Sequence, residues 1–388
     1  MDFPALAPRP RLSLLAKMPA MYDPRFNKMA QVIVNYSIEV QPGQTVYVWG
    51  QTPAAPLMLE IYREILKAGG NAFLRADLPG AQEIFFAHAQ DAQLDFVSPV
   101  DRISVEEGQF DAYIRIGAET NTRRLSNANP ASVQRHQAAM RPILDKRLRR
   151  SAEGNYNWCV TQFPTEAYAM DADMSLAEYT EFVFSACLVN DPDPVARWQE
   201  VGANQQRYVD FLSSKRVLRV QGSDADLTLR IEGRTWKNSQ GKRNFPDGEI
   251  FTGPHEDSVN GWVRFSYPAV YQGREVSGIQ LWFEGGRVVK ATAEKNEDFL
   301  LKVLDTDAGA RTVGEFAIGT NYGITRFSRN ILFDEKIGGT FHLAVGAGYP
   351  DTGSTNTSAV HWDMIAGARD AEISADGEVF YRNGQFLI

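Results

Sequence analysis

Residues 314–321 read GEFAIGTN, residues 333–349 read FDEKIGGTFHLAVGAGY and residues 356–363 read NTSAVHWD. These segments place two of the chain's five histidines, His342 and His361, among several acids. Imidazole and carboxylate are the ligands that zinc and related divalent ions take in proteins. If residues 361–363 form a β-strand, side chains two positions apart lie on one face. We therefore expect His361 and Asp363 to reach one point, while Trp362 packs on the opposite face.

Glycines around this stretch favour a metal-binding interpretation. Four of them flank His342: Gly338, Gly339, Gly346 and Gly348. Glycine allows positive φ and close backbone approach, which suits a chain that bends around a packed ionic group. Two further acids, Glu315 and Glu249, also follow glycines. Histidines that are only packed or hydrogen-bonded would give the same local pattern, so both interpretations stay open at this point.

Composition bounds the class of protein. The chain has 388 residues, 44% of them apolar and 23% charged, which is the profile of a globular protein long enough for two domains. Its net charge of −8 argues against binding to a nucleic-acid backbone. No run of 18 apolar residues is present, so we expect no membrane span. Cys159 and Cys187 lie in apolar runs and are predicted to be buried and reduced, which suits the cytoplasm.

The first half of the chain alternates short apolar strands with helical patterns. Asp23-Pro24 is typical of a helix start. Further helices are expected at 56–67, 81–96 and 130–149, and strands at 45–49, 71–75, 112–116 and 157–163. This alternation predicts an α/β domain with a mainly parallel sheet. We place it at residues 1–190, with 1–21 as a loose arm, and it contains no nucleotide-binding glycine motif.

After NDPDP at 190–194, the sequence pattern changes from alternating strands and helices to mostly strands. One helix is expected at 195–212 and another at 298–304. Strands are expected at 217–221, 226–231, 262–265, 278–283 and 287–293, with a terminal hairpin at 378–386. We therefore predict a β-rich α+β catalytic domain at 191–388 that contains every candidate ligand. His88 and His136, in the first domain, are expected to face solvent.

Several motifs together resemble one known family. They are YDPRFNKMAQVIVNYSIEVQPGQTVYV (22–48), GEIFTGPHEDSVNG (248–261), GEFAIGTN, DEKIGGTFHLAVGAGY and NTSAVHWDM. The chain resembles the aminopeptidase T/PepS family of dinuclear metallo-aminopeptidases (the thermophilic-type leucyl aminopeptidases) along most of its length. The resemblance implies a set of six metal ligands: Glu249, Glu315, His342, Tyr349, His361 and Asp363.

That resemblance also implies a function. It predicts release of N-terminal residues from short peptides by attack of a metal-bridging hydroxide, with Glu249 and Glu315 as catalytic acids. Two divalent ions are expected, zinc first, with cobalt, manganese or magnesium as alternatives. A cytoplasmic homodimer is expected. The chain departs from the pattern in a short segment between Tyr349 and His361, and in His255, which stands at an apolar position of the family.

Two other functions compete with this one. Some relatives on the same scaffold resemble ring-cleaving dihydroxypyridine dioxygenases, which hold one iron on two histidines and one carboxylate. His342, His361 and Asp363 could supply that triad. The third possibility is a peptide-binding module without turnover. Within the DEKIGG motif, Glu335 and Lys336 are secondary candidates, either as an ion pair that fixes the strand or, for Lys336, as a cation that stabilises an oxyanion.

Overall fold

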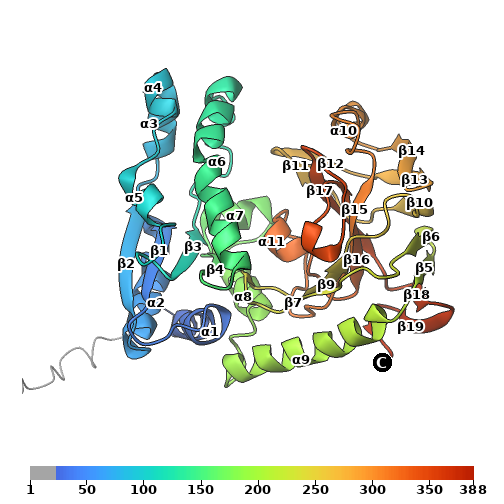
Figure 1. The fold of residues 1–388 in the computed structure, drawn as a ribbon, viewed down its shortest axis with the longest axis horizontal. Helices are drawn as coiled ribbons and strands as arrows, with labels where there is room; N and C mark the ends of the chain where they lie inside the picture. The colour runs from blue at the N-terminus through green and yellow to red at the C-terminus, as the bar shows by residue number, and fades with distance from the viewer. Residues whose placement is uncertain (1–22) are drawn as a thin grey trace, which may run out of the picture.

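The computed structural model describes residues 23–388, which form two lobes (Figure 1). The expected loose arm at 1–21 lies outside the described residues. A parallel sheet with its helices makes up the lobe on the left of Figure 1, and a strand-rich lobe lies on the right. Helix α9 (Pro194–Ser213) runs beneath the strand-rich lobe. The fold class is the one that the alternation of strands and helices predicts.

Five parallel strands form the sheet of the first lobe, in the order β2-β1-β3-β4-β8. They are β1 (Thr45–Gln51), β2 (Asn71–Asp77), β3 (Ala112–Gly117), β4 (Asn157–Gln162) and β8 (Asn244–Phe245). The strand β8 comes from the second half of the sequence, and Val160 of β4 pairs with Asn244. No sequence pattern predicts this addition, because a strand of two residues shows no periodicity.

The helices predicted for this lobe are present with one correction, and the structure adds helices at 99–103, 166–171 and 176–186. They are α1 (Arg25–Val32), which continues as the π-helical turn Ile33–Ser37, then α2 (Ala55–Lys67), α5 (Pro99–Ile103), α6 (Pro130–Ala152), α7 (Glu166–Asp171) and α8 (Leu176–Ala186). The single helix expected at 81–96 is instead two helices, α3 (Ala81–His88) and α4 (Asp91–Leu94). Ala89 leaves the helical region with ψ 132°, and Gln90 forms a capping box with Gln93 that begins α4.

Two sheets build the second lobe. The larger has eight strands in the order β14-β13-β10-β6-β5-β18-β19-β20, and the smaller has five in the order β17-β16-β15-β9-β7. The larger comprises β5 (Val217–Gly222), β6 (Ala225–Arg230), β10 (Asn260–Arg264), β13 (Gln280–Glu284), β14 (Arg287–Thr292), β18 (Glu372–Ala375), β19 (Glu378–Arg382) and β20 (Gln385–Phe386). The smaller comprises β7 (Lys237–Ser239), β9 (Glu249–Thr252), β15 (Val313–Gly319), β16 (Thr340–Gly346) and β17 (His361–Gly367). The hairpin β11 (Ala269–Tyr271) and β12 (Arg274–Val276) and the helices α10 (Glu297–Leu304) and α11 (Ile331–Asp334) complete the lobe.

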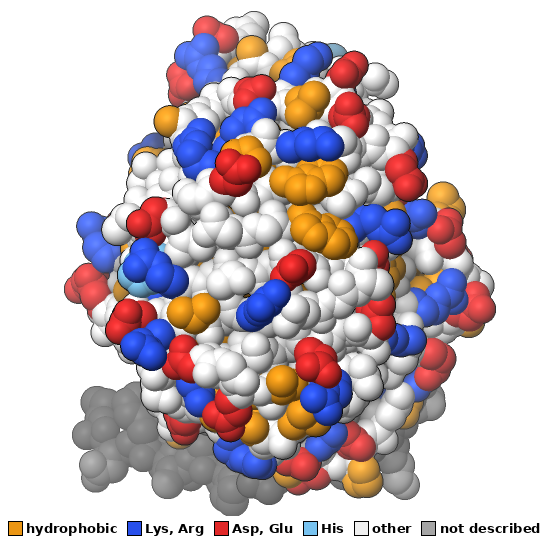
Figure 2. Space-filling view, turned by 90° about the vertical axis from the view of Figure 1, so that its right-hand side faces the viewer, with side chains coloured by type: hydrophobic (Ala, Val, Ile, Leu, Met, Phe, Trp, Pro, Cys, Tyr) orange, Lys and Arg blue, Asp and Glu red, His pale blue; other side chains and the backbone are white. Residues whose placement is uncertain are grey.

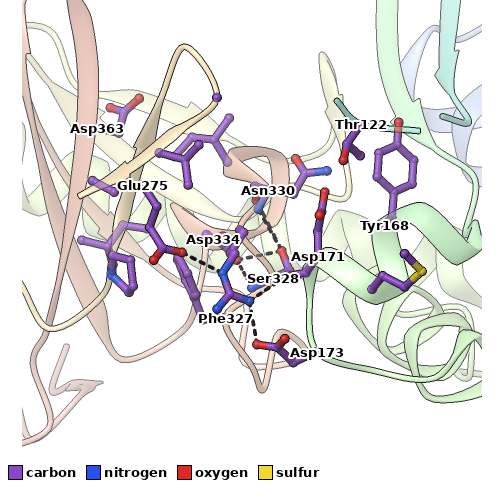
Figure 3. Close-up of a pocket in the computed structure, with 18 of the residues that line it drawn as sticks. Thr122, Tyr168, Asp171, Asp173, Glu275, Phe327, Ser328, Asn330, Asp334 and Asp363 are labelled. Carbon is purple, nitrogen blue, oxygen red and sulfur yellow. Dashed lines mark hydrogen bonds and ion pairs between the residues drawn. The ribbon is translucent and has the colours of Figure 1, made fainter. Parts of the chain in front are cut away.

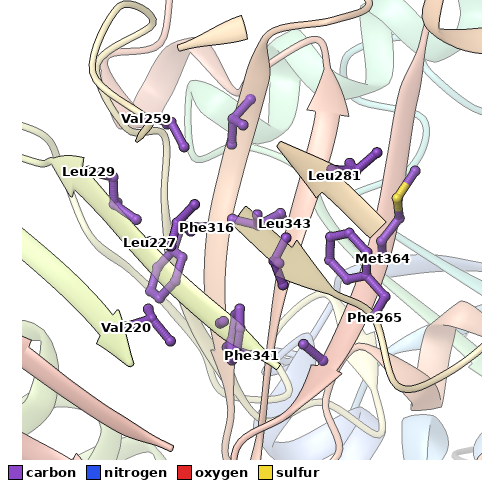
Figure 4. Packing of buried hydrophobic residues seen from close by; sticks show 14 of the residues in the cluster. Val220, Leu227, Leu229, Val259, Phe265, Leu281, Phe316, Phe341, Leu343 and Met364 are labelled. Atoms are coloured by element: carbon purple, nitrogen blue, oxygen red, sulfur yellow. The ribbon is translucent and has the colours of Figure 1, made fainter. Parts of the chain in front are cut away.

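The hydrophobic core of the second lobe lies between these two sheets (Figure 4). Phe316, Leu343 and Met364 of the smaller sheet are fully buried there. Leu227 and Val220 approach them from the larger sheet (Figure 4). Because strand side chains alternate, the neighbouring positions of β15, β16 and β17 must point to the other face of the smaller sheet. The core therefore fixes which residues that second face presents.

On the side shown in Figure 2, lysines and arginines are interspersed with acids. Across residues 23–388, no helix has both the length and the apolarity needed to cross a membrane. Cys159 and Cys187 are buried free thiols, as predicted.

Candidate metal centre

Strand register brings the predicted site residues onto one face of the smaller sheet. In antiparallel pairs, directly opposite residues share a face. Ala344 of β16 lies opposite both Glu315 of β15 and Asp363 of β17. His342, two positions from Ala344, lies on the same face. The strands thus present two acids and an imidazole around one central alanine.

The positions between these side chains carry small residues. Ala317 lies opposite His342, and Gly319 lies opposite Glu249 of β9. A Cβ at Gly319 would come within 2.2 Å of the Ile337 carbonyl, so the loop before β16 can approach only a glycine. Small side chains leave space above the sheet for an ion between the longer acids and imidazoles.

His342 is the centre of this group and is fully buried. Its Nε2 lies 3.6 Å from Glu315 Oε1 and 3.7 Å from Glu249 Oε2. The distance from Nε2 to Asp363 Oδ1 is 3.9 Å. These separations exceed hydrogen-bond length. The shortest of them falls within the range of about 3.3–3.6 Å that separates two atoms bound about 2.0–2.2 Å from one tetrahedral metal, and the other two exceed that range slightly.

His361 joins the group from the end of β17. Its Nε2 lies 3.5 Å from Glu315 Oε2 and 3.6 Å from Asp363 Oδ1. The other ring nitrogen, Nδ1, is 2.7 Å from the Ala347 carbonyl and must carry the proton there, because a carbonyl only accepts. In the neutral imidazole, Nε2 therefore directs its lone pair toward the acids, the arrangement that metal-bound histidines use. Trp362 is buried in the core on the opposite face, as expected.

Two carboxylate oxygens of the group have no hydrogen-bond partner. Glu249 Oε2 and Asp363 Oδ1 are buried and unsatisfied in the described structure. An orphaned buried acceptor costs free energy, more so when it is charged. A cation between the carboxylates would satisfy both atoms, so the residues fit a metal ion.

Lys336 places an ammonium group beside these acids and is completely buried. It pairs with Glu335 and lies 3.4 Å from Glu249 Oε1. With Glu315 and Asp363, which lie beside His342, the group holds four carboxylates against this one ammonium, so 4 − 1 leaves a net charge of −3 when the carboxylates are ionised and both imidazoles are neutral. Buried charge of one sign needs compensation. Divalent cations provide it better than any side chain within reach.

Without metal, protons provide part of this compensation. Burial lowers the pKa of His342, but the carboxylates of Glu315 and Glu249 outweigh it and raise the pKa to about 9. Burial raises the pKa of Asp363 to about 6. Burial likewise raises the pKa of Glu249, even beside Lys336. Metal ions would displace these protons, because ligands bind in their deprotonated form.

The remaining candidates divide between the centre and its surroundings. Tyr349 packs edge-on to His361 with ring centroids 5.2 Å apart, but 43% of the residue is exposed, which places it at the rim. His255 lies apart and bonds through Nε2 to the Glu232 carbonyl at 2.8 Å, so it belongs to a loop contact. From the sequence, Glu335 is only a secondary candidate. The structure groups it with His342 and Asp363, all with ligand atoms within 4.8 Å of one another.

A cavity of about 610 Å³ opens beside the centre (Figure 3). Asp363 and Ile365 form part of its wall. Residues of the first lobe, such as Tyr168 and Asp171, form the facing wall, so the cavity lies between the lobes. Arg329 joins the two sides: its Nε donates to Glu275 at 2.9 Å, and Nη1 donates to the carboxylate of Asp173 at 2.7 Å (Figure 3).

The loop that leads to His361 is held by buried and half-buried charges. Arg234 donates to Glu256 at 2.5 Å and also to the Gly353 carbonyl. Glu256 in turn accepts the Thr355 backbone N–H at 2.6 Å. Further along, Asp307 accepts the Ala359 N–H at 2.7 Å. These contacts fix the short segment between Tyr349 and His361.

Comparison with known proteins gives a consistent picture. The model of the thermophilic metalloprotease (M29) family matches residues 22–386. Aminopeptidase 2 of Geobacillus stearothermophilus is 28% identical over 416 residues, covering 94% of this chain and 98% of that protein.

Two solved structures share the fold. Wild-type AmpT from Thermus thermophilus superposes with a TM-score of 0.81 and 24% identity, covering 94% of this chain and 99% of that one. The 2,5-dihydroxypyridine dioxygenase from Pseudomonas putida KT2440 superposes with a TM-score of 0.55 and 13% identity, covering 93% and 96%. At these identities the likeness is one of fold alone.

Proposed function

This chain belongs to the thermophilic metalloprotease (M29) family, and from that premise we propose that its buried acids and imidazoles hold divalent metal ions for peptide hydrolysis. It is a metal-dependent aminopeptidase. We propose that it releases N-terminal residues from short peptides bound in the cavity beside Asp363. The observation that carries this proposal is the group of buried, unsatisfied ligand atoms that includes Asp363 Oδ1, because Asp363 also lines that cavity.

We assign the metal-holding role to six residues and add a seventh. The six are Glu249, Glu315, His342, Tyr349, His361 and Asp363, and Glu335 joins them because it faces His342 and Asp363. The excess of negative charge suits two divalent ions better than one. Zinc fits the mixture of imidazole and carboxylate ligands, and cobalt or manganese accept the same set.

Divalent ions bound there supply a Lewis acid and lower the pKa of a bound water. The protein's own groups then have separate tasks. Glu249 Oε2 has no hydrogen-bond partner, so this carboxylate is placed to accept a proton from water and return it to the leaving amine. Glu315 lies between both histidines and keeps their Nε2 atoms toward the centre.

Charge and shape explain why the enzyme acts on free N-termini. The surplus of carboxylates attracts the α-ammonium group of a peptide, whereas an acylated terminus gains nothing from it. A cavity of about 610 Å³ has the size of a small-ligand site and accommodates a short peptide. The facing wall from the first lobe limits access of water and of longer chains.

The dioxygenase alternative does not account for this site. One iron on His342, His361 and Asp363 would leave Glu249 and Glu315 buried beside it without a task. We propose in addition that the protein works as a homodimer in the cytoplasm. Light scattering coupled to size-exclusion chromatography of the metal-loaded protein tests the dimer: twice the mass of 43.3 kDa is expected, and that of a single chain would contradict it.

The hydrolytic proposal is tested with paired substrates and paired variants. Metal-loaded protein should cleave leucyl and other aminoacyl anilides but leave the N-acetylated forms intact. His361→Ala should abolish turnover, whereas His255→Ala removes an imidazole outside the centre and should retain it. Near-ultraviolet circular dichroism verifies that both variants fold. Equal turnover by the two variants, or no cleavage of any free-amino substrate by metal-loaded protein, would refute the proposal.

A further inference from the structure

The first lobe contains a second cavity, of about 430 Å³, far from the strands that carry the metal ligands. Gln51, Asp77 and Ala118 line it, and these residues end or follow β1, β2 and β3. In the order β2-β1-β3-β4, the chain passes from β1 to β2 on one side, whereas β3 and then β4 lie on the other side, so the strand order reverses between β1 and β3. In open parallel sheets, ligands bind at the carboxyl ends of the strands at such a point.

One wall of this cavity is apolar and aromatic. Phe85, Phe86, Phe96 and Met140 contribute from α3, α6 and the segment between them. His136 of α6 lies with them: its ring centroid is 4.9 Å from that of Phe85, and its Nδ1 bonds to the Leu94 carbonyl at 2.9 Å. The expectation that His136 faces solvent is therefore wrong, because α3 and α4 fold back over α6.

Most charged groups in the cavity already have partners. Arg75 bonds to Asp101 at 2.8 Å and to Asp77 at 3.1 Å. Arg124 pairs with Glu119. Such pairs connect the cavity walls, but they leave few free donors or acceptors for a ligand.

Two lining groups of opposite charge, Arg115 and Glu83, each have a polar atom without a partner. Arg115 stacks on Trp49, with its guanidinium carbon 3.9 Å from the ring centroid, and its Nη1 is buried without a hydrogen-bond partner. Glu83 Oε2 is also buried without a partner. Within the described residues, neither side chain has an oppositely charged group within 4.0 Å. A buried polar atom without a partner is costly, so each of these two atoms favours a ligand that completes its hydrogen bonding.

We infer that this cavity binds a free α-amino acid with an apolar side chain. Its carboxylate would accept from Arg115, its ammonium group would donate to Glu83, and its side chain would pack among Phe85, Phe86 and Met140. Guanidinium–carboxylate and ammonium–carboxylate contacts are the strong hydrogen bonds of proteins. The source of the ligand rests on the proposed function, since an aminopeptidase releases this class of molecule as product.

Calorimetric titration of the metal-loaded full chain with L-phenylalanine tests this inference. Arg115→Gln and Glu83→Gln should each weaken the affinity of this cavity for L-phenylalanine by about tenfold to a hundredfold. This is the effect of losing one charged hydrogen bond. Arg141→Gln, an exposed position on α6 paired only with Asp145 nearby, should leave binding unchanged. All three variants should hydrolyse aminoacyl anilides at the wild-type rate, which separates this site from the metal centre.

Two ligand analogues test the need for both charges. We expect 3-phenylpropanoate, which lacks the ammonium group, and phenethylamine, which lacks the carboxylate, to bind much more weakly than L-phenylalanine. Equal affinity of the wild type for 3-phenylpropanoate, or unchanged L-phenylalanine binding in both cavity variants, would overturn the inference. A soak of metal-loaded crystals with L-selenomethionine gives a variant-free measurement: an anomalous peak near Phe85 and Met140 supports the site, and no peak there refutes it.

Discussion

Glu256→Gln should destabilise the protein through the loop that carries His361. Partial burial raises the pKa of Glu256, but hydrogen bonds from the Thr355 N–H and from Arg234 outweigh this and lower it to about 2, from an ordinary 4.5. Glutamine keeps the size of the side chain but loses its charge. The side chain of Arg234, only 6% exposed, would then be left without its carboxylate.

The magnitude follows from proton linkage. A pKa of about 2 in the folded chain and 4.5 in the unfolded chain corresponds to about 3 kcal/mol at pH 7. Breaking a buried ion pair by removing one partner costs about 3–5 kcal/mol, which is consistent. Because the folded pKa is depressed, this stabilisation is complete above the unfolded value and disappears as the pH falls toward 2. At pH 3 about half of it should remain.

Urea unfolding of the metal-free wild type and variant at pH 7 and pH 3 measures both quantities. The matched control is Asp257→Asn, which removes the neighbouring exposed pair with Arg230 and should cost about 0–1 kcal/mol. Hydrogen exchange at the Thr355 N–H should accelerate in the Glu256 variant alone. A free-energy difference below 1 kcal/mol at pH 7, or one that does not shrink at pH 3, would refute the reasoning.

Three further changes test the centre and its surroundings. Ala344→Leu places a large side chain between Glu315 and Asp363, so the metal content measured by mass spectrometry should fall to background. The control Ala359→Leu, on the exposed loop, should keep full metal content. Lys336→Met leaves buried carboxylates without their cation, so the metal-free protein should lose about 3–5 kcal/mol in urea unfolding; equal stability would show that the pair is not needed. Burial raises the pKa of Asp334 to about 7, and a raised carboxyl pKa means that stability falls as the pH rises from about 4 to 7. Asp334→Asn should flatten this slope in unfolding measurements, and a slope equal to that of the wild type would contradict the assignment.

Local patterns were sufficient to predict the faces of the strands. The alternation of His361, Trp362 and Asp363 identified the site face and the core face of β17, and both are found in the structure. Strand alternation with helices likewise predicted the parallel sheet. These inferences depend only on periods of two and of about four residues, which the sequence displays directly.

Long-range pairing could not be predicted in this way. Glu335 lies in a loop without periodicity, and it reaches His342 only because the loop before β16 packs closely against Gly319. The addition of β8 to the first sheet joins residues more than 80 positions apart, such as Val160 and Asn244. The partial burial of His136 depends on how α4 packs against α6. In each case the deciding contact comes from tertiary packing, which leaves no local signal.

Anomalous diffraction from zinc-loaded crystals, recorded on both sides of the zinc absorption edge, tests the central claim most directly. We predict two peaks per chain between the side chains of Glu249, Glu315, His342 and Asp363. The absence of any peak among these residues, with zinc bound elsewhere or not at all, would contradict the assignment of the metal centre and the hydrolytic function built on it.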